Sequence, residues 1–140
     1  MIEAVFWVSI FLLVYPYLVY PLLIALLGIV RPRPVRKQNG YQPNVTVLIP
    51  AYNEADCIEA TLRNMLRQTY PKNKLQIMVV SDGSDDGTDD IVRRFADQGI
   101  ELLRQEGRGG KALALNAAVR HATGEIIVFS DANSLFAPEA

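Results

Sequence analysis

The sequence predicts an α/β protein in which an N-terminal transmembrane helix precedes a doubly wound, mainly parallel sheet. Three observations support this fold class. Residues 4–30 carry no charge, strand-like and helix-like segments alternate after that run, and clusters of polar residues and glycines follow the predicted strands. These observations divide the chain into a transmembrane helix at 1–30, a basic linker at 31–44 and a soluble domain at 45–140.

The apolar run from Ala4 to Val30 is longer than the roughly 20 residues needed to cross the hydrocarbon core of a membrane. Pro16 and Pro21 lie inside the run and should kink the helix, because proline lacks a backbone N–H. A cleaved signal peptide is the main alternative, but no Lys or Arg precedes the run and no small-residue cleavage site follows it. A buried core helix is the other alternative.

The flanks of this helix predict its orientation. Only Glu3 precedes the uncharged run, whereas four basic residues follow it: Arg31, Arg33, Arg36 and Lys37. Because basic flanks stay on the cytoplasmic side, we expect a protein of the inner or plasma membrane whose C-terminal domain is cytoplasmic. Proline and glycine within residues 31–44 suggest a semi-rigid linker near anionic headgroups, although a simple stop-transfer signal explains the same residues.

The soluble domain begins with a strand and continues as helices and strands in alternation. Val45–Ile49 is a β-branched apolar run that ends at a proline, which is typical of a buried strand. A helix capped by Asn53 should follow, because apolar residues recur at helical spacing from Ile58 to Leu66. The remaining elements, in order, are a strand at 76–80, a helix from about Thr88, a strand at 100–103, a helix at 111–122 and a strand at 125–129.

Alternation of this kind implies parallel strands with helices on both faces of the sheet. Right-handed crossovers between the strands then give a doubly wound arrangement. A net charge of −1 argues against a general nucleic-acid-binding protein, so we expect no nucleic-acid partner. Cys57 is the only cysteine, which excludes an internal disulfide and zinc sites of the CxxC kind.

Four clusters of polar residues and glycines each follow a predicted strand. They are Ala-Tyr-Asn-Glu at 51–54, Ser-Asp-Gly-Ser at 81–84, Gly-Arg-Gly-Gly-Lys at 107–111 and Ser-Asp-Ala-Asn at 130–133. In open α/β sheets the carboxyl edge of the strands is where ligands bind. The four clusters therefore predict one binding site at this edge.

Each cluster also has a purely structural interpretation. The first suits the start of a helix, the second favours a turn, and the third is compatible with an ordinary connection. A phosphate loop of the Walker type is excluded, because Ala112 stands where that motif needs Ser or Thr. Asp131 is harder to explain structurally, because a carboxylate that leaves a buried strand loses hydration unless something binds it.

The segments VTVLIPAYNEAD, VVSDGSDDGT, GRGGKALALNAAV and GEIIVFSDAN closely resemble the motifs of glycosyltransferase family 2, in family order and with suitable spacing. The resemblance runs from about Val45 to the end of the chain. It implies the GT-A fold, with the fourth strand beside the first and the strand order 3-2-1-4. A membrane helix before this domain is similar to the arrangement in the processive polysaccharide synthases, so polysaccharide biosynthesis is the expected setting.

The resemblance also implies a nucleotide-sugar pocket with substrate-binding residues from all four clusters: Pro50, Ala51, Tyr52, Glu54, Asp82, Arg108, Gly110, Lys111 and Asp131. The first cluster would lie below the base and ribose. Asp82 would accept a hydrogen bond from the base, which is expected to be uracil. Lys111, with Arg108 or Gly110, would lie near the base or the diphosphate.

Asp131 and Asn133 correspond to the DxD motif of the family, which joins the donor diphosphate to a divalent metal. The resemblance therefore implies Mg²⁺ or Mn²⁺ as a cofactor, with Asp131 and Asn133 as its ligands. The second acid of the motif is an asparagine in this chain. An amide oxygen still binds these cations but brings no charge, so the affinity for the metal should be lower.

The implied reaction is transfer of a sugar from a UDP-sugar to an acceptor hydroxyl, with inversion, and the acceptor is a carbohydrate or is lipid-linked. We expect no catalytic residue in this chain, because the general base of the family belongs to a motif later than residue 140. On that expectation the chain by itself binds the donor weakly and transfers little or no sugar.

Two other classes of protein remain as alternatives. One is a nucleotidyltransferase, which also holds a nucleotide on an open α/β sheet. Such enzymes usually carry a loop rich in glycine and basic residues directly after the first strand, where this chain has Ala-Tyr-Asn-Glu. The other alternative is a non-catalytic, membrane-tethered module that binds a nucleotide or a partner.

Overall fold

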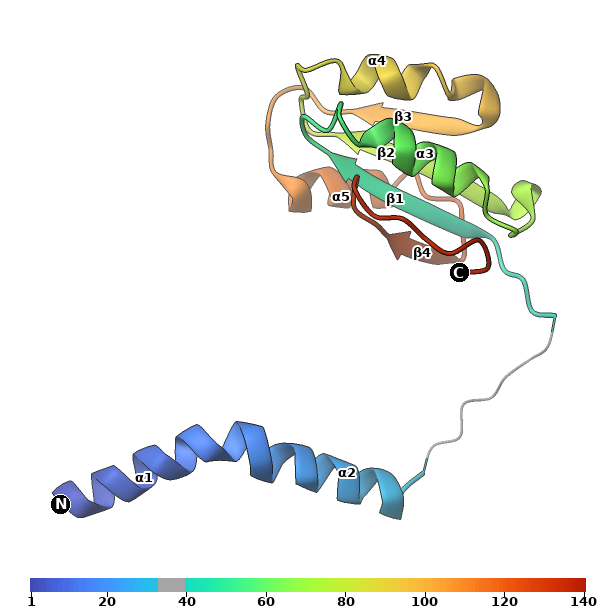
Figure 1. Cartoon of the computed structure of the whole chain (residues 1–140). Helices are drawn as coiled ribbons and strands as arrows, with labels where there is room; N and C mark the ends of the chain where they lie inside the picture. Colours follow the sequence, from blue (N-terminus) through green and yellow to red (C-terminus); the bar gives the residue numbers. More distant parts are fainter. Residues whose placement is uncertain (33–39) are drawn as a thin grey trace. The chain divides into compact units, whose positions relative to one another are not determined.

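The computed structural model describes residues 1–32 and 40–140, and the chain divides into two compact units (Figure 1). The first unit is Met1–Gly40 and the second is Tyr41–Ala140. Half of the predicted linker, residues 33–39, lies outside the described residues, including the basic residues 33, 36 and 37. The orientation predicted from those residues stays a prediction.

The first unit contains one continuous apolar helical segment, Ile2–Val30, with a mean hydropathy of 2.3. It consists, in order, of the α-helix α1 (Ile2–Val14), the π-helical turn η1 (Tyr15–Val19) and the α-helix α2 (Tyr20–Val30). Pro16 and Pro21 account for the wider turn, because a proline supplies no N–H and crowds the carbonyl four residues earlier. Figure 1 shows the helix axis bending there, which confirms the predicted kink. At about 1.5 Å per residue, the segment is long enough to cross a membrane.

The second unit is built on a four-stranded parallel sheet with the strand order β3-β2-β1-β4. In chain order, the strands are β1 (Val45–Ala51), β2 (Leu75–Ser81), β3 (Ile100–Arg104) and β4 (Ile126–Phe129). The predicted fold class and strand order are therefore confirmed. The first three strands extend one or two residues further than their apolar runs indicate.

Helices cover both faces of this sheet: α3 (Ile58–Leu66) and α4 (Thr88–Arg93) pack on one face, and α5 (Lys111–Val119) packs on the other. Short 3₁₀ turns, η2 (Lys72–Lys74) and η3 (Ala96–Gln98), precede β2 and β3. The alternation of side chains along β1 supplies both cores. Val47 and Ile49 belong to the core with α3 and α4, whereas Leu48 belongs to the core with α5.

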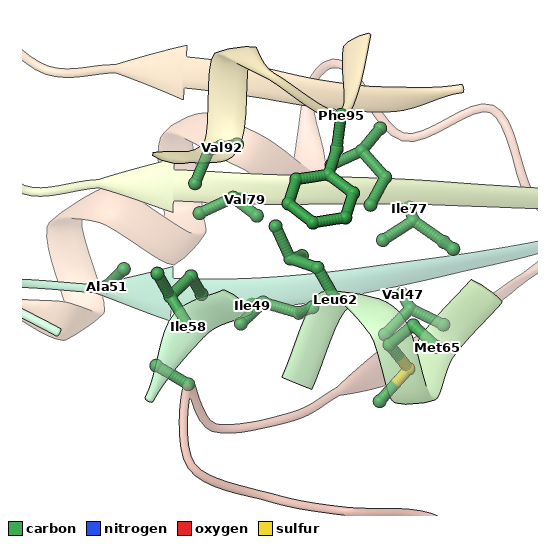
Figure 2. Packing of buried hydrophobic residues seen from close by; sticks show 12 residues of the cluster. Val47, Ile49, Ala51, Ile58, Leu62, Met65, Ile77, Val79, Val92 and Phe95 are labelled. Carbon is green, nitrogen blue, oxygen red and sulfur yellow. The ribbon is translucent and has the colours of Figure 1, made fainter. Parts of the chain in front are cut away.

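Figure 2 shows the larger core, in which Leu62 of α3 and Phe95 lie over Ile49, Ile77 and Val79 of the sheet. Leu62, Ile49 and Val79 are completely buried. Burying a side chain of this size contributes about 1.5–3 kcal/mol. This packing fixes β1 and β2 rigidly, and their carboxyl ends carry two of the four polar clusters.

The helix after β1 begins later than the sequence predicts. Its first residue is Ile58, with Cys57 as the N-cap residue, and no side chain caps it. Asn53 is therefore not the helix cap. Its φ of 55° lies in the left-handed region, and its side-chain amide donates a hydrogen bond of 2.8 Å to Asp85. Helix α5 is also shorter than the predicted helix at 111–122, since it ends at Val119.

Candidate functional site

The four polar clusters lie at the carboxyl edge of the sheet. Because all strands are parallel, the loops after them leave the sheet on one side (Figure 1). Backbone hydrogen bonds continue between these loops beyond the strand ends. The Asp82 N–H donates to the Ala51 carbonyl at 3.0 Å, and the Gln105 N–H donates to the Ser81 carbonyl at 2.9 Å. The starting points of the first three loops are therefore fixed relative to one another.

Asp82 is the most deeply placed acidic residue of the site, with 4% of its surface exposed. Its Oδ1 accepts a hydrogen bond from the Gly109 N–H at 2.7 Å, and its Oδ2 accepts one from the Gly110 N–H at 2.7 Å. Charge-assisted bonds of this kind are among the stronger hydrogen bonds in proteins. They hold the loop of residues 107–110, called the glycine loop below, against the end of β2.

Next to Asp82 lies a small pocket of about 80 Å³, lined by Pro50, Ala51, Tyr52, Asp82 and Lys111. Residues from three of the predicted clusters therefore converge on one space. Typical ligand pockets are about 300–1,000 Å³, so this one has room for only part of a nucleotide. The glycine loop also lines a wider, open depression of about 500 Å³.

The other predicted binding residues contact the residues that line the pocket. The Arg108 guanidinium lies 4.2 Å from the centre of the Tyr52 ring, a cation–π geometry. The Lys111 ammonium forms an ion pair with the Asp131 carboxylate, and Gly110 contacts Asp82. Lys111 and Asp131 thus neutralise each other, whereas the Arg108 guanidinium rests on an uncharged ring.

Glu54 is the exception among the predicted residues of the first cluster. It does not line the pocket, and its Oε2 accepts a hydrogen bond from the Cys57 thiol at 3.0 Å. Burial of the thiol and this contact with the Glu54 carboxylate raise the pKa of Cys57 to about 11. A direct role for Glu54 in binding the donor stays a prediction.

The prediction that Asp131 loses hydration at the end of a buried strand was wrong, although Asp131 pairs with Lys111, which lines the pocket. The Asp131 side chain is 57% exposed, so it is not a desolvated carboxylate. It follows β4, which pairs with β1 and forms one edge of the described sheet. The strand residues Ile126 and Phe129 are themselves exposed. The apolar run at 126–129 reflects an edge strand with an exposed apolar face and not a buried one.

Asp131 and Asn133, the predicted metal ligands, are both exposed beyond the end of β4. Within residues 1–32 and 40–140, no group of three or more His, Cys, Asp or Glu side chains gathers in a way that could hold a metal ion. One carboxylate and one amide oxygen suit Mg²⁺ or Mn²⁺ chemically, because these hard cations take oxygen ligands and share phosphate oxygens with a substrate. The donor set therefore fits a metal that a bound diphosphate helps to hold.

Sequence reasoning missed Arg104, the last residue of β3. Its guanidinium donates to the Ser84 carbonyl at 3.1 Å and forms an ion pair with the buried Asp89 carboxylate. Arg104 thereby supports the loop that carries Asp82. The sequence feature that could have identified Arg104 is its position at the carboxyl end of a strand, directly before one of the loops of the site.

Comparison with known proteins assigns the chain to a family. The profile of the family described as Glycosyl transferase family 2 matches residues 46–140. Glycosyltransferase AglE of Haloferax volcanii is 41% identical over 91 residues, which cover 64% of this chain and 30% of that protein. This chain therefore spans less than a third of the length of that relative.

Solved structures share the fold, among them the following two. One is a mannosyltransferase, PcManGT from Pyrobaculum calidifontis, in complex with GDP-Man and Mn²⁺; the TM-score is 0.76 at 42% identity over 90% of this chain and 39% of that one. The other is S. aureus TarS 1–349 in complex with UDP, with a TM-score of 0.66 at 28% identity over 69% of this chain and 29% of that one. The matched profile covers well over half of the residues, and the sheet and its polar edge agree with it, so the chain belongs to glycosyl transferase family 2.

Proposed function

We propose that residues 41–140 form the nucleotide-sugar-binding region of a glycosyltransferase. The observation that carries the proposal is the convergence of Tyr52, Asp82 and Lys111 on one pocket at the carboxyl edge of the sheet, with Asp131 paired to Lys111. That edge is where open α/β sheets bind ligands. Solved relatives that carry GDP-Man or UDP support the same class of ligand for this chain.

In this proposal, Asp82 recognises the base while it holds the glycine loop. Each carboxylate oxygen has two lone pairs, so the bonds from Gly109 and Gly110 leave acceptor capacity for a base N–H. Pro50, Ala51 and Tyr52 would form the wall below the base and ribose. Because the pocket measures about 80 Å³, it would hold only part of a nucleotide, and the rest would lie outside it.

The proposed base is uracil, whose single ring N–H suits the remaining acceptor capacity of Asp82. Guanine is the specific alternative, because it presents two neighbouring N–H donors to a carboxylate and because the mannosyltransferase relative carries GDP-Man. The two bases make opposite predictions for competition between UDP and GDP. A direct comparison of the two nucleotides therefore decides between them.

Lys111 and Arg108 would carry the charge of the diphosphate. The Lys111 ammonium is paired with Asp131 in this structure, and the Arg108 guanidinium lies on the Tyr52 ring. A diphosphate attracts both cations more strongly than a single exposed carboxylate does, so both side chains would turn towards it. Release of Lys111 frees Asp131 to act, with Asn133, as an oxygen ligand of Mg²⁺ or Mn²⁺.

The proposed reaction is displacement at the anomeric carbon of the donor by an acceptor hydroxyl, with inversion. The residues of this region hold the donor by its base and diphosphate and fix the direction in which the nucleotide leaves. A bound divalent metal supplies charge stabilisation for the departing diphosphate. The acceptor, a carbohydrate or a lipid-linked sugar, is proposed from the family alone.

We further propose that Ile2–Val30 anchors the chain in a membrane with the binding region on the cytoplasmic side. The segment is apolar throughout, and Arg31 follows it directly. Nucleotide sugars used in the cytoplasm would then reach the site directly. Asp97 is exposed on the binding region, so labelling of an Asp97→Cys variant in sealed right-side-out and inverted vesicles tests the orientation. Vesicles that have been opened serve as the control.

Nucleotide titration of the full chain in detergent tests the binding proposal. UDP and GDP are titrated separately, with and without Mn²⁺, against the wild-type chain, Asp82→Asn and Asp90→Asn. Asp90 is the matched control, because its exposed carboxylate pairs with Arg93 of the same helix. We expect UDP binding that Asp82→Asn weakens and Asp90→Asn leaves unchanged.

Two results count against the proposal. Failure of the wild-type chain to bind either nucleotide indicates a non-catalytic module. Equal affinities of wild type and Asp82→Asn, with both folded by circular dichroism, exclude Asp82 as the residue that recognises the base. Tighter binding of GDP than of UDP corrects the base while the rest of the proposal stands.

A further inference from the structure

Three consecutive backbone N–H groups directly after Tyr52 are held by side-chain oxygens of the segment VVSDGSDDGT at 79–88, called the second motif below. The Asn53 N–H donates to Ser84 Oγ at 3.1 Å. The Glu54 N–H donates to Thr88 Oγ1 at 2.9 Å. The Ala55 N–H donates to Asp86 Oδ2 at 3.0 Å. Residues 53–55 and 84–88 are separated by α3 and β2 in the chain, so this is a tertiary contact between two loops, called the clasp below.

Within residues 1–32 and 40–140, these three N–H groups have no other hydrogen-bond partner. Helix α3 begins only at Ile58, so the three N–H groups make no helical hydrogen bonds. Asn53 has a φ of 55°, a conformation that residues with a side chain rarely adopt. The Asn53 and Asp85 residues exchange two further bonds of 2.8 and 3.0 Å. The loop therefore keeps its shape because the second motif holds it.

Thr88 occupies the centre of the clasp. It is completely buried, and its hydroxyl donates to Asp86 Oδ1 at 2.5 Å. Because a hydroxyl has one proton, that bond leaves its lone pairs free to accept the Glu54 N–H. Asp86 also accepts the Thr88 N–H at 3.0 Å. The chain of bonds from Glu54 through Thr88 to Asp86 is continuous, and its members polarise one another.

The clasp also makes these three N–H groups unavailable for binding an anion. Successive backbone N–H groups in a tight turn often form a concave site for an anion such as a diphosphate. Here the groups point at Ser84, Thr88 and Asp86, so they are not available to a phosphate. The first motif thus contributes the wall of the pocket, through Tyr52, and not a cradle for phosphate.

We propose that Thr88 and Asp86 are positioning residues for the donor site: they hold the backbone after Tyr52 and so keep the wall of the nucleotide pocket in its binding shape. Asp86 is exposed while Thr88 is buried, so the two can be altered independently. This inference rests on the proposed function, because it assumes that the pocket lined by Tyr52 and Asp82 binds a nucleotide.

The test compares Thr88→Val with Thr88→Ser in the full chain in detergent. Valine has the shape of threonine but no hydroxyl, so it leaves the Glu54 N–H without its acceptor. Serine keeps the hydroxyl. Asp86→Asn, which keeps only one of two acceptor oxygens, is the second variant and alters an exposed side chain. Asp90→Asn is the control, because Asp90 is an exposed neighbour outside the clasp.

Three quantities are measured for each variant: hydrogen–deuterium exchange of a peptide covering residues 51–57, the Kd for UDP, and the melting temperature. If the loop of Thr88→Val holds its binding shape only about a tenth of the time, its apparent Kd rises about tenfold. We expect faster exchange in the peptide and roughly tenfold weaker UDP binding for Thr88→Val and Asp86→Asn. Thr88→Ser and Asp90→Asn should match the wild type in both.

Rescue by serine separates positioning from a general loss of stability. A Thr88→Val chain that melts earlier but binds UDP with the wild-type Kd overturns the inference. An Asp86→Asn chain that shows neither faster exchange nor weaker binding also overturns the inference. If Thr88→Val fails to fold, the result for Asp86→Asn decides. A wild-type chain that binds no nucleotide removes the proposed function together with the inference, whereas normal wild-type binding with unaltered variants removes the inference alone.

Discussion

Replacing Gly83 with alanine should weaken nucleotide binding, because Gly83 is where the glycine loop rests on the loop that follows β2. Gly83 has a φ of +77°. A Cβ at this position would lie 3.0 Å from the carbonyl carbon of Gly107 and 3.1 Å from its oxygen. Both contacts are with backbone atoms, so rotation of a side chain cannot relieve them.

Two effects add up at this position. A left-handed conformation costs a residue with a Cβ about 1–2 kcal/mol. Crowding a well-packed site costs roughly a further 1–3 kcal/mol. Gly99 separates the two, because its φ of +85° is similar but its Cβ would have no atom within 4 Å. Gly99→Ala should lose about 1–2 kcal/mol of unfolding free energy, and Gly83→Ala about 2–5 kcal/mol in total.

Only Gly83→Ala should affect the site. Displacement of Gly107 shifts the neighbouring Gly109 and Gly110, whose N–H groups hold Asp82. We expect a Kd for UDP raised on the order of tenfold for Gly83→Ala and unchanged for Gly99→Ala. Denaturant unfolding gives the free energies and nucleotide titration gives the Kd values. Equal stability losses in the two variants, with an unaltered Kd for Gly83→Ala, would refute the reasoning.

Three further predictions concern stability and reactivity. Leu62→Ala removes a completely buried side chain and should lower the free energy of unfolding by about 2–5 kcal/mol. Leu135→Ala, at an exposed position, should change the free energy of unfolding little. Similar losses in both variants would contradict the assigned core. Burial alone would raise the pKa of Asp86, but hydrogen bonds from the Thr88 hydroxyl and from the Ala55 and Thr88 N–H groups hold the pKa below its ordinary value of 3.8. The ionised carboxylate therefore stabilises the fold above pH 3.8, and this contribution is lost as the pH falls through the lower folded pKa. The stability difference between wild type and Asp86→Asn should accordingly shrink below pH 3.8, and a constant difference across the acid range would exclude Asp86 as its source. Because burial and Glu54 raise the pKa of Cys57 to about 11, alkylation of the folded chain at about pH 8 should be much slower than that of the unfolded chain, and equal rates would show that the thiol is unperturbed.

Much of the fold follows from local sequence. The β-branched runs at 45–49 and 76–80 predict strands, because such side chains suit a pleated surface that is buried on both faces. The apolar spacing in α3 predicts a helix that covers one face of the sheet, and Leu62 lies where that spacing places it. The parallel order of the strands then brings the four polar clusters to one edge, as the connection rules require.

The boundaries and the partners within the site depend on tertiary contacts. Asn53 is a favourable helix cap by local chemistry, yet its amide bonds to Asp85 and α3 begins at Ile58. Asp131 follows an apolar run that suggests burial, yet the run is an edge strand and the carboxylate is exposed. Whether the side chains of an edge strand are buried depends on what packs beside that strand, and the local sequence does not show this.

The sequence by itself determined the apolar helix, the parallel α/β sheet, the edge that carries the site and the family resemblance, because each depends on short-range periodicity or on motif residues close together in the chain. Only the tertiary structure decided that Asp82 holds Gly109 and Gly110, and that Ser84, Asp86 and Thr88 hold the backbone after Tyr52. A hydrogen bond needs its donor and acceptor aligned within about 3 Å, and for loops far apart in the chain only the packed sheet and helices set that alignment.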